Sequence, residues 1–504
     1  MNQNNKSQWN SSLAFLMSMI GAAVGLGNIW RFSYVLYSNG GGSFFIPYFV
    51  AIGLLGIPFL ILEYGLGFKF KTSFSNLLHK IRPRFEVIGW ILGLLAFGVV
   101  TYYMVILAWD IVYLGASPFL AWGADPAGFF SNYVGGDSTI SSWSHLILPT
   151  VAGLVIVWVM IWFISKKELN SGIGKVSKVL IPLLFVIMAA IVIFSLTLPG
   201  HNLGIETLLT PDWSVLFDVN IWLAAFSQII FSLSLGMAIA LTYASYLPED
   251  SKLINNVLIV VSSNSGFEIF TAFGVFSILG FMSVTSGVPI ESLIRQGTGL
   301  VFIVFPTIFN TMGIAGKILG PLFFLAILFA GITSALGFLE PLLNSVCDKF
   351  GFTRKKSASI LCGVGFMISM FFTCGISSYL VEIVDGFLNQ FGILFLIALQ
   401  CIIFGWILGI DDLIEVVNKN SIVHVGKLWV AIIKYILPCV IFIVWTFGII
   451  DLIKTGGFLE LAVDVIITLS ILIASVMLTK FEDYDYKSLE KKKQKAYSKR
   501  KKLY

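Results

Sequence analysis

The sequence has few charged residues for its length. Only 12% of its 504 residues are Asp, Glu, Lys or Arg, whereas 57% are hydrophobic, and the mean hydropathy is +0.92. Soluble domains carry about 25% charged residues, so this composition excludes a water-soluble globular protein. No polar stretch between the apolar runs is long enough to form a soluble domain. We therefore expect an integral membrane protein.

Histidine and cysteine are also scarce. The four histidines form no HExxH-like pair, and the five cysteines show no CxxC spacing. A zinc site needs three or four such ligands close together, and no Ser/His/Asp cluster falls within an apolar run. A membrane enzyme is thus disfavoured, and the cysteines are expected to be packing residues.

The sequence instead contains repeated apolar runs long enough to cross a bilayer as helices. Alternating short strands do not recur, so the spans are expected to be α-helical. The twelve runs are 13–37, 43–68, 88–117, 146–165, 174–198, 219–247, 256–284, 316–346, 358–376, 379–408, 428–450 and 458–480. An all-α protein with twelve transmembrane helices is the predicted fold class.

Positive charge is distributed unevenly between the two sides of these runs. Most of the 32 Lys and Arg residues fall in segments on the side of both termini, and the opposite loops hold only Arg295, Lys317 and Lys454. The positive-inside rule then places both termini in the cytoplasm of a multi-pass protein of the cell membrane. The basic tail 481–504 is expected to anchor this topology at anionic lipid headgroups, and no nucleic acid is expected as a partner.

Two of the runs contain residues that disfavour a continuous helix. Residues 21–28 read GAAVGLGN in the first run, and residues 226–236 read FSQIIFSLSLG in the sixth. Interruptions in corresponding helices of two halves indicate a transporter site at the bilayer midplane, and an odd separation of five spans fits an inverted repeat. Small residues also allow close helix packing, but Asn28 beside the glycines favours a break from Gly21 to Gly27.

A broken helix frees backbone groups that can bind ions and substrate. Freed carbonyls are hard oxygen ligands suited to Na⁺, and amides at a helix N-terminus favour a carboxylate. A single hydroxyl within a helix is weak evidence for a binding site, because it can bond to the backbone of its own helix. Six polar side chains on four spans are stronger evidence: Asn28, Ser232, Ser234, Asn264, Thr333 and Ser334.

These motifs resemble the neurotransmitter:sodium symporter family, in particular its prokaryotic amino-acid branch. The resemblance is carried by GAAVGLGNIWRF (21–32), NGGGSFFIPY (39–48), YY (102–103), SQIIFSLSLG (227–236), TYASY (242–246), SSNSGFE (262–268), AGITS (330–334) and Asp385. It implies a LeuT-like fold with a five-plus-five inverted repeat and broken helices 1 and 6. The implied division is a cytoplasmic segment 1–12, repeats 13–200 and 201–408, helices 11 and 12 within 409–480, and the tail 481–504.

The resemblance implies two sodium sites. The first would use the Ala23 carbonyl, Asn28, Ser232 and Asn264, together with the carboxylate of the substrate. The second would use the carbonyls of Gly21, Val24 and Ala330 and the hydroxyls of Thr333 and Ser334. A channel or receptor that had kept this scaffold without coupling would lack such ligands, and here they are present.

The resemblance also implies a substrate site. The substrate carboxylate would meet the Leu26 and Gly27 amides and Tyr103, and its amine would meet the Ala23 and Phe231 carbonyls and Ser234. Its side chain would meet Val99, Phe231, Met237, Ser334 and Phe338, with Ala22, Ala335 and Gly337 leaving room. Monoamine carriers have aspartate where this chain has Gly25, so we expect sodium-coupled import of neutral, hydrophobic L-amino acids. A taurine-like, betaine-like or small-amine substrate remains the alternative.

Glu268 lies one helical turn after Asn264. A carboxylate there resembles the chloride-independent branch of the family, in which it stands in for a bound anion. The alternative is a structural carboxylate bonded to Tyr48 or Gln228. Chloride is therefore not expected as a cofactor, whereas two sodium ions are.

The gates follow from the same resemblance. Arg31 would pair with Asp385 above an aromatic lid of Tyr103 and Phe231, and the cytoplasmic network would consist of Lys6, Trp9, Tyr246 and Asp348. Gly172 and Pro182 match a motif whose helix unwinds to admit water. Among the other acids, Glu63 and Glu340 would bond either to freed backbone or to neighbouring side chains, and Asp110 and Asp464 have no assigned role.

Overall fold

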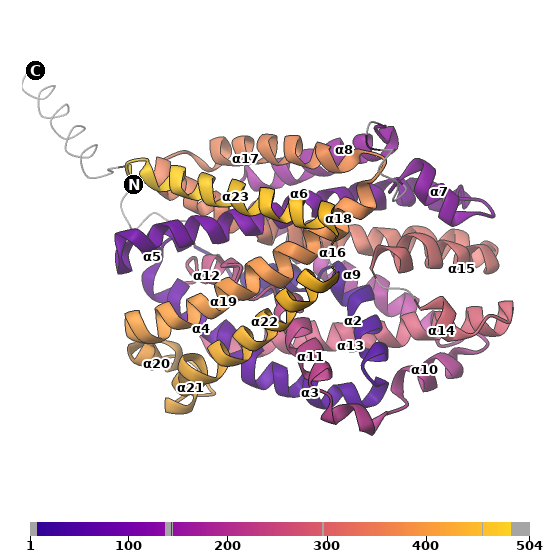
Figure 1. Ribbon diagram of the computed structural model, residues 1–504, viewed down its shortest axis with the longest axis horizontal. Helices are drawn as coiled ribbons and strands as arrows, with labels where there is room; N and C mark the ends of the chain where they lie inside the picture. Colours follow the sequence, from indigo (N-terminus) through magenta and orange to yellow (C-terminus); the bar gives the residue numbers. More distant parts are fainter. Residues whose placement is uncertain (1–7, 137–142, 144, 295–296, 456, 485–504) are drawn as a thin grey trace, which may run out of the picture.

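The computed structural model describes residues 8–484 apart from 137–142, 144, 295–296 and 456. Within these ranges the chain folds as helices joined by short connections (Figure 1). The strand-type pairing there is limited to an isolated bridge between Leu146 and Cys374. The all-α fold class predicted from the apolar runs is confirmed.

Among the described residues, ten helical segments are long and apolar enough to cross a membrane. They are Gly41–Phe70, Pro83–Phe119, Leu148–Ser165, Ile173–Ser195, Leu253–Ser286, Ile314–Phe350, Arg354–Thr373, Ser377–Asn418, Lys427–Ile450 and Phe458–Lys480. A further span is the pair α1 (Ser12–Ala23) and α2 (Leu26–Ser38), bent by 50°. The sixth apolar run holds α11 (Val219–Ser232) and α12 (Ile239–Ala244), each too short to cross alone. Every predicted apolar run thus holds helix.

The shorter helices gather at the two ends of the bundle (Figure 1). One end, called the basic end here, carries α5 (Phe74–Ile81), α20 (Leu413–Asn418) and α21 (Lys427–Ala431). The other, called the loop end, carries α7 (Pro126–Tyr133), α10 (His201–Leu209), α14 (Ile290–Leu293) and α15 (Phe305–Thr311). Both ends of the described chain lie at the basic end.

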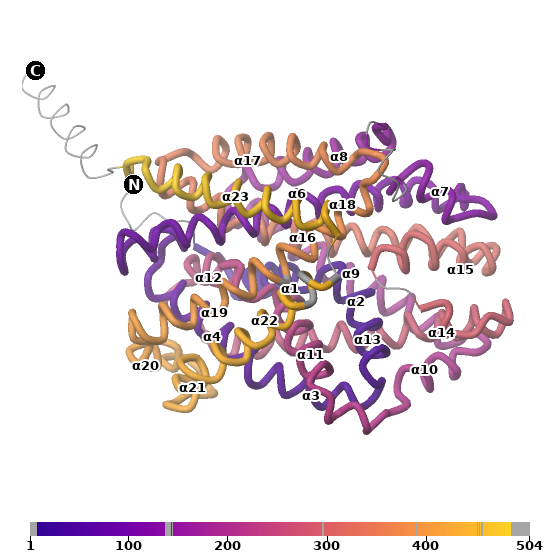
Figure 2. The backbone as a smooth tube through the Cα atoms, viewed as in Figure 1, coloured from indigo at the N-terminus to yellow at the C-terminus, as the bar shows by residue number. Residues whose placement is uncertain are grey.

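The centre of the bundle is formed by α6 (Glu86–Ala116) and α16 (Ile314–Phe350), which pack against each other. The most apolar stretch of each is 83% buried, whereas that of α23 (Phe458–Lys480) is 11% buried. Helices that are apolar all round belong in a core or against lipid. Because α1 packs on α9 (Ile173–Ser195) and α16, and α2 on α13 (Leu253–Ser286), the bent span is held inside the bundle (Figure 2).

The break in the first span is shorter than the predicted Gly21 to Gly27. The Val24 amide donates to the Ile20 carbonyl at 2.7 Å, which keeps Gly21 within α1. The Gly25 amide donates to Asn28 Oδ1 at 2.8 Å, which caps α2 and lets it begin at Leu26. Only Val24 and Gly25 therefore leave the helix.

The tenth span is longer than the predicted 379–408. It runs through α18 (Ser377–Phe387), the π-helix Leu388–Ile393, α19 (Leu394–Ile402), the π-helix Ile403–Gly409 and a short 3-10 turn into α20. The last segment is amphipathic, because Leu413 and Val417 are buried while Asp412 and Glu415 are exposed. The predicted span ended at residue 408 because charged residues follow it. In the structure the apolar face of that following segment is enough to continue the helix.

Candidate functional site

The break between α1 and α2 presents backbone groups of both signs. Carbonyls at the end of α1 and amides at the start of α2 have no partners within their own helices. Residues Ala22 to Asn28, except Val24, line one cavity. The sequence therefore places a helix C-terminus and a helix N-terminus at the same site.

A second break faces the first. Between α11 and α12 the chain passes through Ser234, Gly236 and Ala238 with φ values of +51°, +74° and +56°. L-residues adopt this conformation at a cost of about 1–2 kcal/mol each, so the surroundings must hold it. Gln400 Nε2 donates to the Gly236 carbonyl at 3.0 Å, and the buried Glu63 lies beside the Gly236 and Ala238 backbone. Neither carboxylate oxygen of Glu63 has a hydrogen-bond partner among the described residues, so both predicted roles of Glu63 stay open.

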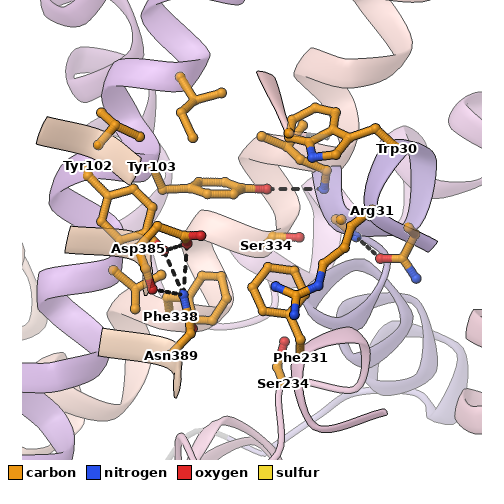
Figure 3. Close-up of a pocket in the computed structure, with 18 of the residues that line it drawn as sticks. Trp30, Arg31, Tyr102, Tyr103, Phe231, Ser234, Ser334, Phe338, Asp385 and Asn389 are labelled. Atoms are coloured by element: carbon orange, nitrogen blue, oxygen red, sulfur yellow. Dashed lines mark hydrogen bonds between the residues drawn. The ribbon is translucent and has the colours of Figure 1, made fainter. Parts of the chain in front are cut away.

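The cavity encloses about 970 Å³ of empty space, its open mouth included. It runs from the two breaks to Thr298, which lies beyond α14 towards the loop end. Figure 3 shows its central part, with aromatic rings and Ser334 around the open space. All residues predicted to contact the substrate line it: Ala23, Leu26, Gly27, Val99, Tyr103, Phe231, Ser234, Met237, Ser334 and Phe338.

The start of α2 lies next to Tyr103. The Leu26 amide is 3.5 Å from the Tyr103 hydroxyl, so two groups predicted to meet a carboxylate adjoin each other. A Cβ atom built on Gly25 would lie 3.0 Å from Ser334 Oγ and 3.4 Å from the Tyr103 hydroxyl. Gly25 lines the cavity, and a side chain there would crowd Ser334 and Tyr103.

The groups predicted to meet an amine also converge. Ser234 Oγ donates to the Ala22 carbonyl at 3.3 Å, next to Ala23, and the Ser234 amide donates to the Phe231 carbonyl at 3.2 Å. The expectation for Gly337 was wrong: it does not line the cavity, and a Cβ there would lie 2.7 Å from the Ala22 Cβ. Gly337 instead lets α16 approach α1. Ala335 does not line the cavity either.

The side chains predicted for the first sodium site form a buried hydrogen-bonded chain. Asn28 Nδ2 donates to Asn264 Oδ1 at 2.8 Å, and Asn264 Nδ2 donates to Ser232 Oγ at 2.5 Å. Their exposed fractions are at most 2%. Amide and hydroxyl oxygens have two lone pairs each, so they can accept a hydrogen bond and still face a cation.

The oxygens predicted for the second sodium site also cluster, between α1 and α16. Ser334 Oγ lies 3.1 Å from the Gly21 carbonyl and 3.3 Å from the Val24 carbonyl. Thr333 Oγ1 lies 3.0 Å from the Ala330 carbonyl, and a Cβ on Gly21 would lie 2.9 Å from the Thr333 Cβ. These ligands are all neutral oxygens. Nowhere in the described ranges do three His, Cys, Asp or Glu side chains gather as a metal cluster, so the donor set suits a monovalent cation rather than zinc.

Glu268 is fully buried and accepts three hydrogen bonds. Tyr48 donates to Oε2 at 2.6 Å, while Gln228 Nε2 and Asn28 Nδ2 donate to Oε1 at 3.1 and 3.0 Å. The partners of the structural alternative, Tyr48 and Gln228, are thus present. The contact with Asn28 also puts this carboxylate beside the first cluster, so both interpretations fit.

The predicted outer gate is open. Arg31 and Asp385 form no ion pair, and the guanidinium carbon of Arg31 lies 4.4 Å from the centre of the Phe231 ring. The two rings of the predicted aromatic lid, Tyr103 and Phe231, are not packed together. Tyr103 instead packs against Phe338, with 6.0 Å between the ring centres. Arg31 and Asp385 lie on opposite sides of the cavity (Figure 3).

The opposite side of the cavity is closed. Trp9 is 3% exposed, and its indole donates to the Tyr243 carbonyl at 2.9 Å while its amide donates to the Tyr246 carbonyl at 3.0 Å. Asp348 accepts from the Ser73 amide at 3.0 Å, and Lys6 lies outside the described residues. Helix α9 follows Gly172 and continues unbroken through Pro182, so the predicted unwinding is absent from this conformation.

The remaining acids differ in their surroundings. Arg354 holds Glu340 through two bonds of 2.6 and 2.7 Å, and Tyr246 donates to it at 3.2 Å. For Glu340 the partners are therefore neighbouring side chains. Asp110 is fully buried without a hydrogen-bond partner, and Asp464 is buried although most of the apolar stretch of α23 is not.

The cavity has further lining residues that sequence reasoning did not assign: Trp30, Tyr102, Ile106, Thr298, Val381, Glu382 and Asn389. Helical spacing would have found all of them except Thr298, because each lies three or four residues from a predicted site residue: Trp30 from Leu26, Tyr102 from Val99, Ile106 from Tyr103, and Val381, Glu382 and Asn389 from Asp385. No periodicity leads to Thr298, which belongs to a connecting segment.

Comparison with known proteins gives consistent results. The sequence model of the sodium:neurotransmitter symporter family matches residues 6–127 and 124–481. An uncharacterized sodium-dependent transporter of Methanocaldococcus jannaschii is 39% identical over 86% of this chain and 89% of its own. The sodium- and chloride-dependent creatine transporter 1 of Bos taurus is 29% identical over 81% of this chain and 72% of its own. The crystal structure of MhsT in complex with L-phenylalanine matches with a TM-score of 0.74 and 29% identity, covering 88% of this chain and 99% of that one.

Proposed function

The chain belongs to the sodium:neurotransmitter symporter family, and on this premise we propose that it imports neutral, hydrophobic L-amino acids together with sodium by alternating access. Sodium-coupled transport by a LeuT-like membrane fold follows from the family and the structural likeness. The proposal for the substrate depends mainly on one observation. The cavity space beside Gly25, which has no side chain, adjoins the start of α2, Tyr103 and Ser334.

A substrate that brings its own carboxylate fits this space. The Leu26 and Gly27 amides begin α2, and a helix N-terminus favours an anion. The Tyr103 hydroxyl adds a donor beside them. A monoamine has no carboxylate to fill this position, and MhsT, a relative of the same fold, was crystallised with L-phenylalanine. Both points support an amino acid as the substrate.

The rest of the cavity supports a neutral, apolar side chain. Val99, Met237 and Phe338 line it with apolar surface, and Ser334 is small. Arg31 and Asp385 also line it, but their opposite charges belong to the proposed outer gate rather than to side-chain recognition.

Coupling follows from the proposed ligands. A sodium ion held by Asn28, Ser232 and Asn264 would have the substrate carboxylate as a further ligand, so each lowers the cost of burying the other. A second sodium ion between Gly21, Val24, Ala330, Thr333 and Ser334 would join α1 to α16. A membrane potential adds about 2.3 kcal/mol per charge per 100 mV to inward sodium movement.

Three further proposals concern the setting of the transporter. Glu268 supplies a fixed carboxylate beside the first sodium site, so transport should not require chloride. The excess of Lys and Arg at the basic end supports a cytoplasmic location for both termini in the plasma membrane. Residues 13–200 and 201–408 would be inverted repeats, with the α1–α2 and α11–α12 breaks as equivalent features.

The substrate is tested by thermal unfolding of the purified protein with and without sodium, screened over the twenty amino acids, taurine, betaine and small amines. A ligand raises the melting temperature when it prefers the folded state. We expect stabilisation by hydrophobic L-amino acids that depends on sodium. Stabilisation by taurine, betaine or an amine alone would contradict the proposed substrate class but not the family's sodium coupling.

A further inference from the structure

Asp385 is held by two neighbouring side chains on the wall of the cavity. The Tyr102 hydroxyl donates a hydrogen bond to Asp385 Oδ1, and Asn389 Nδ2 lies 2.8 Å from the same oxygen. Asn389 Nδ2 also lies 3.0 Å from the Tyr102 hydroxyl. The three side chains therefore close a triangle of hydrogen bonds, drawn as dashed lines in Figure 3.

The position of Asn389 follows from the helix that carries it. It lies four residues after Asp385, so its amide also reaches the Asp385 carbonyl at 3.0 Å. The π-helix Leu388–Ile393 begins one residue earlier. Single π-turns inside α-helices are frequent at functional sites. Here the turn sits beside the outer gate, at the junction of α18 and α19.

One half of the Asn389 amide is unused. Its Oδ1 atom is buried and has no hydrogen-bond partner, although leaving such an atom unpaired is costly. Asn389 lines both the main cavity and a smaller one beside it, and Arg31 and Phe231 line both as well. Arg31 itself makes no hydrogen bond to a described side chain or carbonyl and rests on the Phe231 ring.

We propose that Asn389 is a positioning residue of the outer gate: its amide nitrogen fixes Asp385, and its amide oxygen accepts a hydrogen bond from Arg31 when the gate closes. The guanidinium has five N–H donors in a planar fork, enough for Asp385 and Asn389 together. The closed gate then satisfies the unpaired oxygen, so closure is favoured over the open conformation described here. This inference rests on the proposed transport function.

The test measures the rate at which labelled substrate dissociates from purified protein in sodium. Asn389→Ala removes both halves of the amide, and Asn389→Leu removes them while keeping a similar volume. We expect dissociation to be about tenfold faster in both variants, which is the effect of losing one hydrogen bond to a charged group. Stabilisation by sodium alone should be unchanged, because Asn389 touches neither proposed sodium site.

A matched control is Asn418→Ala at the other end of the same helical span. Asn418 exchanges two hydrogen bonds with the Val425 backbone, at 2.8 and 2.9 Å, far from the gate. It should leave the dissociation rate at the wild-type value. Dissociation as slow in both Asn389 variants as in the wild type would overturn the role of Asn389.

A double-mutant cycle with Arg31→Lys separates this role from general loosening of the cavity. Lysine keeps the charge but not the planar fork of N–H donors. The increase in dissociation rate caused by Asn389→Ala should therefore be at least about threefold smaller in the Arg31→Lys background than in the wild type. Additive effects would overturn the inference even if the single variants dissociate faster. Failure of the wild type to bind any substrate in sodium would instead contradict the proposed function.

Discussion

Gly25 lies where a side chain would meet Ser334 and Tyr103. Gly25→Asp would place a carboxylate in the space proposed for the carboxylate of the substrate. We expect the affinity for amino acids to fall by about 100-fold or more, since burying like charges together costs several kcal/mol. Calorimetric titration of the amino acid found in the thermal screen measures this. Gly25→Ala, which adds one methyl group but no charge, should lose less, and equal losses in the two variants would contradict the argument.

Thr333 offers a test of the second sodium site. Thr333→Val keeps the shape and removes the oxygen, so the apparent sodium affinity should fall by about tenfold or more. Thr101→Val is the matched control, because the Thr101 hydroxyl bonds only to the Gly98 carbonyl. The sodium dependence of substrate binding measures both variants. An unchanged sodium affinity in Thr333→Val would remove Thr333 from the site.

For single residues, the sequence predicted which ones belong to the substrate site better than it predicted which atoms they contact. Every residue predicted to contact the substrate lines the cavity. The family resemblance assigned these residues, whereas the helix breaks and polar side chains within apolar runs indicated only the spans that carry the site. The Gly337 expectation was wrong because small residues serve close helix approach and open space equally well. Their difference depends on which atom lies opposite, here the Cβ of Ala22.

At the scale of elements, the segment between α11 and α12 is held in a strained conformation. Ala238 has a positive φ and is buried, whereas Ala240 is equally buried within α12. Glycine relieves the strain at the first position and weakens the helix at the second. Ala240→Gly should therefore destabilise the protein by about 1 kcal/mol more than Ala238→Gly does. Thermal unfolding in detergent compares them, and an equal or reversed order would contradict the argument.

A buried ion pair joins the end of α16 to the start of α6. Lys349 Nζ lies 2.7 Å from Glu86 Oε1, and both side chains are at most 5% exposed. Lys349→Met removes the ammonium group from Glu86 and from Asp483 and leaves Glu86 with His79 and Trp90 as partners, so we expect a loss of about 3 kcal/mol in stability. The more exposed pair Lys434 and Asp411 should contribute less than about 1 kcal/mol.

Thermal unfolding of Lys349→Met and Lys434→Met compares the two pairs. Adding Glu86→Gln to Lys349→Met should recover part of the loss, because the carboxylate charge is then removed. A Lys349→Met variant as stable as Lys434→Met would contradict the importance of the buried pair.

The elements themselves were largely predictable, and their ends were not. Apolar length located every span, but hydrogen bonds decided the boundaries. The Gly25 amide bond to Asn28 starts α2 earlier than the glycine pattern indicates. The buried face of α20 extends the tenth span beyond its apolar run. The first effect is a local side-chain cap and the second depends on tertiary packing, and a hydropathy pattern contains neither.

At the scale of the whole molecule, the cavity is open towards the loop end and closed by Trp9 towards the basic end. The sequence predicts residues for both proposed gates but not which gate is shut, since alternating access would require the same chain to adopt both arrangements. Arg31 resting on Phe231 and Asp385 bonded to Tyr102 are features of this one conformation.

Sodium-driven amino-acid uptake by this protein can be measured in proteoliposomes. The purified protein is reconstituted, and uptake of the amino acid that stabilises it best is measured with an inward sodium gradient and with the gradient replaced by potassium. We expect accumulation above the outside concentration only with the sodium gradient, and we expect Asn28→Ala to abolish it. Equal uptake with and without the sodium gradient, or normal transport by Asn28→Ala, would contradict the proposed function.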